Sequence, residues 1–169
     1  MQQQEKTSDG PTFGFLTVVD SPTHGVFGGY LLVDELGRPV EFHCTTPVKV
    51  SRAQQILYGP TLQGHLHGRQ IGATLLAEAT TQPTVVLTDV ESMLQVQPHT
   101  SLPVAFVQRA GADDVVAGFV IGAARVRPHD GDAPGEAVVR DQLAALGAAV
   151  DLCEPFERIR AAIDEAQRH

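Results

Sequence analysis

The sequence predicts a single α/β domain, in which an antiparallel meander of three strands is continued by parallel strands and helices pack on the sheet. Three observations predict this fold class. Residues 12–45 hold three β-type segments joined by short turns, and residues 83–107 hold two short apolar runs typical of strands buried on both faces. Residues 137–167 show helical periodicity twice, which indicates two C-terminal helices. A chain of 169 residues with 43% hydrophobic content fits one domain and excludes general disorder.

The predicted domain spans residues 12–169 and follows a flexible polar arm, residues 1–11. FGFLTVVD is apolar at both odd and even positions, as expected for a strand in the middle of a sheet. GVFGGYLLVD forms the second strand, with Gly28 and Gly29 predicting a bulge or a point of close approach. PVEFHCT alternates with period two, so we expect one buried apolar face made of Val40, Phe42 and Cys44.

Helical signals begin at Ser51, which forms a capping box with Gln54 and predicts a short helix ending near Tyr58, before Gly59-Pro60. A second helical stretch covers residues 62–79. It carries Gly64, Gly68 and Gly72 at intervals of four, which would form one smooth stripe that lets another backbone approach closely.

The C-terminal half continues with PTVVLTD, a strand ending at Asp89, followed by a brief helix over 91–95. LPVAFV predicts a second buried strand, and VVAGFVIGAARV predicts a third. A flexible loop over 127–136 precedes the final helices. In the last helix, Arg160 and Asp164, and likewise Asp164 and Arg168, are four residues apart on the face predicted to be exposed to solvent, so we expect them to form ion pairs.

Charge limits the classes of partner. The formal net charge is -8, so we expect no broad nucleic-acid-binding face. From Phe42 to Ala77 there is no Asp or Glu, and this stretch predicts a mildly positive face. No apolar run approaches the ~20 residues of a membrane span, and the N-terminus lacks the apolar core of a signal peptide, so we expect a cytoplasmic protein with no membrane contact.

Two carboxylates stand at predicted strand ends, Asp20 and Asp89. In open α/β sheets ligands bind outside the carboxyl ends of strands, so the two acids could converge on a divalent metal ion. The competing interpretation is that Asp20 begins a turn and Asp89 caps a helix, both common roles for aspartate.

The order of elements, with VVD, GGY, GR and LTD at matching places between Phe13 and Val107, resembles the ribonuclease H-like fold. This resemblance implies that Asp20 and Asp89 are metal ligands for Mg²⁺ or Mn²⁺ in a phosphodiester hydrolase. In the ribonuclease H-like fold a further acidic metal ligand lies on a helix, at a place where this chain has Gln54 and Gln55. The resemblance therefore implies either a degenerate metal site or a site whose further acid is Glu78 or Asp141. The stretch from GGYLLVDELGRP to ILYGPTL also resembles bacterial proteins of unknown function.

Cys44 is the candidate nucleophile, because a thiol activated by an imidazole such as His24 or His65 could act in catalysis. The competing interpretation is an apolar core cysteine. His65 and His67 match no zinc-binding spacing and are interpreted as surface or loop residues.

The sequence contains no complete catalytic constellation, and we expect no cofactor outside the metal-dependent alternative. It therefore favours a non-catalytic domain that acts through a protein partner or as a homo-oligomer. The alternative is a metal-dependent phosphodiester hydrolase using the strand-end carboxylates.

Overall fold

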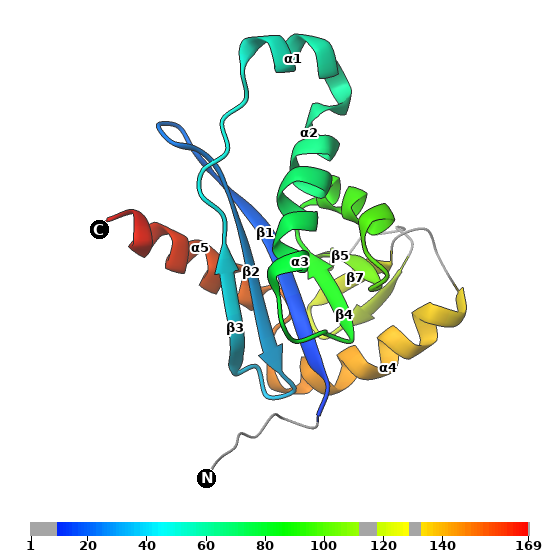
Figure 1. Ribbon diagram of the computed structural model, residues 1–169. Coiled ribbons are helices and arrows are strands. Elements are labelled where there is room, and N and C mark those ends of the chain that lie inside the picture. The colour runs from blue at the N-terminus through cyan, green and yellow to red at the C-terminus, as the bar shows by residue number, and fades with distance from the viewer. Residues whose placement is uncertain (1–9, 112–117, 129–132, 169) are drawn as a thin grey trace.

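The computed structural model describes residues 10–111, 118–128 and 133–168 (Figure 1). Most of the expected N-terminal arm, and residues 129–132 of the expected loop over 127–136, lie outside these residues.

The described residues form one seven-stranded sheet in the order β3-β2-β1-β4-β5-β7-β6. Its first three strands are the expected antiparallel meander, and the next two are added in parallel, so the predicted α/β fold class is confirmed. The strands are β1 (Thr12–Ser21), β2 (Gly25–Asp34), β3 (Pro39–Cys44), β4 (Val85–Thr88), β5 (Val104–Arg109), β6 (Phe119–Ile121) and β7 (Ala124–Pro128).

The one C-terminal strand expected from VVAGFVIGAARV is instead an antiparallel hairpin of β6 and β7. Gly122, with a φ of 60°, lies in the turn between them. Glycine adopts this left-handed conformation at little cost, which explains why the apolar run reverses there.

The helices follow the predicted order. The capping box at Ser51 is present and starts α1, and the stretch from 62 to 78 is continuously helical with a π-helical middle. The elements are α1 (Arg52–Tyr58), the 3₁₀ turn η1 (Gly59–Thr61), α2 (Leu62–Gly64), the π-helix η2 (His65–Gly72), α3 (Ala73–Glu78), the 3₁₀ helix η3 (Glu91–His99), α4 (Ala133–Ala149) and α5 (Glu154–Gln167).

The sheet separates two hydrophobic cores. Odd-numbered residues of β1, such as Phe15, pack with α4 and α5, whereas even-numbered residues, such as Leu16, pack with η2, α3 and η3. Figure 1 shows the two groups of helices on opposite sides of the sheet.

Gly28 and Gly29 of β2 allow a helix to approach each face. A Cβ on Gly28 would lie 2.2 Å from Ile71 of η2, and a Cβ on Gly29 would lie 2.3 Å from Ile159 of α5. The predicted close approach is therefore confirmed. The predicted bulge is not at these residues, because pairing with β1 is regular there and the irregularity of β2 falls between Leu32 and Val33, against β3.

The expected burial of β3 is reversed. Val40 and Phe42 are 42% and 40% exposed and Cys44 is exposed, whereas Glu41 and His43 on the other face are partly buried. The cause is a polar contact: the Glu41 carboxylate accepts hydrogen bonds from the Thr80 hydroxyl at 2.7 Å and the Thr81 N–H at 2.7 Å. Burial alone would raise the pKa of Glu41, but hydrogen bonds from His43, Thr80 and Thr81 outweigh it and hold that pKa well below its usual range.

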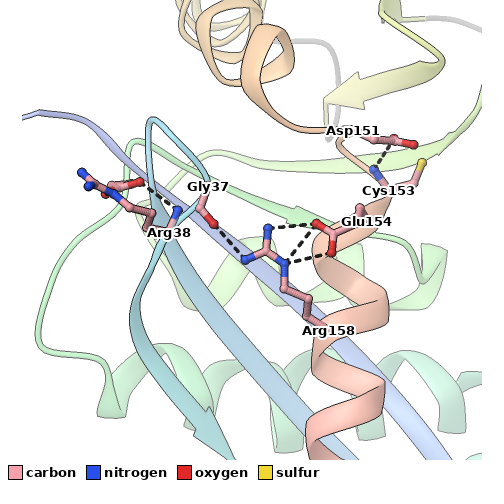
Figure 2. A network of polar contacts seen from close by, with 7 residues as sticks. Gly37, Arg38, Asp151, Cys153, Glu154 and Arg158 are labelled. Carbon is pink, nitrogen blue, oxygen red and sulfur yellow. Dashed lines mark hydrogen bonds and ion pairs between the residues drawn. The ribbon is translucent and has the colours of Figure 1, made fainter.

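A second polar network attaches α5 to the turn between β2 and β3 (Figure 2). Arg158 donates to the Gly37 carbonyl at 2.8 Å and forms a forked contact with Glu154. Asp34 organises the same turn by accepting from the Leu36 and Arg38 N–H groups.

The glycine stripe of the second helix packs against η3, and the predicted close approach of another backbone occurs at Gly68. A Cβ on Gly68 would lie 2.6 Å from the backbone carbon of Gln95, and a Cβ on Gly72 would lie 2.8 Å from the sulfur of Met93. Gly64 faces only the Gln95 side chain, at 2.9 Å.

We expect Gly68→Ala to lower the free energy of unfolding by about 2 kcal/mol, because the new methyl group collides with backbone that cannot move aside. Gly64→Ala is the control and should change it by less than about 0.5 kcal/mol, since Gln95 is exposed and can shift. Urea unfolding of both variants measures the difference. Equal changes in the free energy of unfolding for the two variants would show that the backbone of η3 does not pack closely against Gly68.

Candidate functional site

Asp20 and Asp89 lie near the same end of the sheet but on opposite faces. Leu16 of β1 pairs with Thr88 of β4. Asp89, the residue after Thr88, therefore lies level with Thr17, and Thr17 precedes Asp20 by three residues along β1. Because side chains alternate along a strand, Thr17 faces α5 and Asp20 faces η2. The structure therefore does not bring the two predicted metal ligands together.

Asp89 belongs to a polar cluster on the α5 face. Its carboxylate accepts a hydrogen bond from the Thr17 hydroxyl at 2.6 Å and pairs with the Arg160 guanidinium at 2.6 Å. Arg160 also donates to the Thr17 oxygen at 3.1 Å. The carboxylate that a cation would need is thus already occupied by an arginine from α5.

Arg160 was expected to pair with Asp164, and this prediction is wrong. Arg160 reaches Asp89, while Asp164 pairs with Arg168 at 3.0 Å as expected. Asp89 and Arg160 are 71 positions apart in the sequence, and a contact over that separation leaves no periodic pattern. The i, i+4 rule describes only neighbours within one helix.

The two further acidic candidates lie apart from this cluster. Glu78 is exposed at the end of α3, and Asp141 is exposed on α4, which covers the opposite face of the sheet from α3. Within residues 10–111, 118–128 and 133–168, no group of three or more His, Cys, Asp or Glu side chains could hold a metal ion.

Cys44 is exposed on the edge strand, so the interpretation as a core cysteine is wrong. It borders a hollow of about 260 Å³ that is also lined by His24, Phe27 and Ile163. The His24 Nδ1 atom contacts the Ser21 and Thr23 hydroxyls, at 3.2 and 3.0 Å, and no hydrogen bond joins it to the thiol.

A polar pair of His67 and Ser92, on the face of the sheet covered by η2 and η3, was not predicted from the sequence. His67, interpreted from the sequence as a surface or loop residue, is only 5% exposed, and its Nδ1 atom lies 2.6 Å from the Ser92 hydroxyl. Burial lowers the pKa of His67, and the charge of Asp20 opposes part of that effect. The ring is therefore neutral near pH 7, and its Nδ1 atom accepts or donates a hydrogen bond depending on the tautomer.

Ser92 also lines a groove of about 500 Å³ between the second helix and η3. The other polar side chains along this groove include His65, Arg69, Gln95 and His99, and no acidic residue is among those that line it. The Tyr58 ring stacks on His65 with centroids 4.5 Å apart. Two features of the sequence pointed to this groove, the glycine stripe and the acid-free stretch from Phe42 to Ala77. Neither indicated Ser92 and His99, which lie further along the chain.

No protein-family profile matches the chain, and no curated protein sequence matches it. Among solved structures, one similar chain is an Argonaute from Marinitoga piezophila, whose crystal structure is a complex with a 5′ OH guide RNA. The identity is 10% and the TM-score 0.37, and the similarity covers 78% of this chain and 25% of the Argonaute chain. The chain thus spans about a quarter of that protein, and a TM-score this low assigns neither a fold nor a function.

No helix in the described part of the chain is long and apolar enough to cross a membrane.

We expect Arg160→Met to lower the free energy of unfolding by about 1 kcal/mol, because Asp89 loses the partner of its partly buried carboxylate. Combining it with Asp89→Asn should cost about 1 kcal/mol less than the sum of the two single changes. Chemical denaturation of the four proteins of this cycle measures the coupling. Strict additivity would contradict the pairing.

We expect stability to fall as the pH is lowered from about 7 to about 5, because the unfolded chain binds a proton at His67 near pH 6.5 and the buried ring resists it. His67→Gln should show a shallower fall over this interval, whereas His99→Gln, which changes an exposed ring, should follow the wild type. Urea unfolding at a series of pH values measures the slopes. If His67→Gln keeps the wild-type slope, the ring is not buried as a neutral group.

Proposed function

We propose that this domain is non-catalytic and acts through protein–protein contacts made by helix α1. The observation that supports the proposal is the exposure of two adjacent aliphatic side chains, Ile56 and Leu57, which are 66% and 83% exposed. No residue of α1 is buried, and the helix projects beyond the sheet at one end of the molecule (Figure 1).

Local interactions rather than core packing hold α1. Ser51 and Gln54 form its capping box, and the Gly59 N–H closes its last turn on the Gln55 carbonyl. Isolated helices of fewer than ~12 residues are marginal in water, so a partner that buries Ile56 and Leu57 would stabilise this seven-residue helix substantially.

The chemistry of α1 favours an apolar partner surface. Arg52 is its only charged residue, and the flanking chain from Phe42 to Ala77 has no acid. Protein–protein interfaces bury apolar side chains in their core and place polar groups at the rim.

A second surface favours self-association. Strand β3 lies at the edge of the sheet, where unpaired backbone groups can bind another strand, and its exposed apolar face carries Val40 and Phe42. A second copy of the chain could pair with it about a twofold axis.

The metal-dependent hydrolase suggested by the sequence has no geometric support. It would require Asp20 and Asp89 on one face, and Asp89 free of Arg160.

We expect the double change Ile56→Glu/Leu57→Glu to abolish capture of the partner without lowering the thermal midpoint, because neither side chain packs in the core. The measurement is photocrosslinking in the source cells from a benzoylphenylalanine placed at the exposed Ala53, with mass spectrometry to identify the adduct. Sedimentation at several concentrations shows whether the partner is a second copy.

The matched control is Leu36→Glu, which alters another exposed leucine, 60% exposed, in the turn between β2 and β3. It should leave the adduct unchanged. Absence of any defined adduct from Ala53, or equal loss with Leu36→Glu, would contradict a contact through α1.

A further inference from the structure

We propose that the groove between the second helix and η3 binds a small phosphorylated ligand, with the phosphate held by Arg69, the imidazoles of His65 and His99, and the Ser92 hydroxyl. This inference concerns a different surface from the proposed contact through α1 and does not depend on it.

The first argument is charge. Arg69 is exposed and forms no ion pair within the described residues, and no carboxylate lines the groove. Glu91, the acid next to Ser92 in the chain, is occupied by Arg127 at 2.9 Å. The groove is thus locally positive on a protein whose formal net charge is -8, and an anion there would meet a cation without a competing partner.

The second argument is the arrangement of the donors. His65 and Arg69 are four residues apart on the helix and therefore lie on the same side of it. Close packing of η3 against Gly68 places Ser92 and His99 along the same groove. Arginine donates strong, charge-assisted hydrogen bonds to phosphate oxygens, and an imidazole N–H also donates to them.

The third argument is the hydroxyl of Ser92. When the proton of the His67 ring is on Nδ1, that atom donates to Ser92 at 2.6 Å, and the Ser92 hydroxyl is free to donate to a ligand. The buried pair can therefore present a hydrogen-bond donor inside the groove without moving.

Size selects the class of ligand. A volume of about 500 Å³ is in the ordinary range for small-molecule sites, which is roughly 300–1,000 Å³. The strongly acidic net charge disfavours a long nucleic acid, whose binding depends on many phosphate contacts. A compact phosphate monoester fits both constraints.

The test is calorimetric titration of the full chain with glycerol 3-phosphate and with inorganic phosphate, at constant ionic strength. We expect saturable binding of the phosphate ester that Arg69→Gln weakens about 10-fold or more. The matched control is Arg52→Gln, which removes the same charge from α1, outside the groove, and should bind like the wild type. Comparison of the two probes shows whether the site takes free phosphate or requires an ester.

Histidine ring signals in NMR spectra locate the bound probe. His65 and His99 should shift on titration, whereas His24 and His43, which lie outside the groove, should not. Absence of saturable binding of both probes, or equal weakening by Arg52→Gln, would overturn the proposal. Tight binding of an oligonucleotide with the same Arg69 dependence and no binding of either small probe would also overturn it, in favour of a nucleic-acid site.

Discussion

The architecture depends on the adjacent glycines of β2. Successive residues of a strand face opposite sides, so Gly28 and Gly29 remove the side chain from both faces at a single level of the sheet. Ile71 of η2 and Ile159 of α5 occupy the space left on either side. The second helix and α5 therefore approach the sheet closely at the same place, and the contacts at the ends of β1 and β4 follow from these two positions.

Those contacts give the two faces different chemistry. On the α5 face, Arg160 and Thr17 satisfy the hydrogen-bonding groups of the Asp89 carboxylate. On the opposite face, the neutral ring of His67 supports Ser92 beside a groove that is also lined by the cationic Arg69.

The sequence was sufficient for features that local rules control. Capping chemistry located α1 at Ser51, and apolar runs located β4 and β5. The sequence was not sufficient where a contact with a residue far away in the chain determines the burial or the role of a side chain. Burial of Glu41 by Thr80 and Thr81 reversed the faces of β3, and contact with Arg160 settled the role of Asp89, although neither partner is near in sequence. His67 was misjudged because its burial results from the packing of η3 on a glycine stripe and not from its immediate neighbours.

Helix α5 has a consequence for the order of folding during synthesis. Its residues Phe156 and Ile159 complete the core under β1 and β2, which are made more than 120 residues earlier. Until residues 154–167 leave the ribosome, Phe15 lacks its ring contact with Phe156 and Asp89 lacks Arg160. The opposite face can be covered sooner by η2 and η3. The nascent chain should therefore pass through a half-covered sheet, the stage at which a chaperone that binds apolar surface would act.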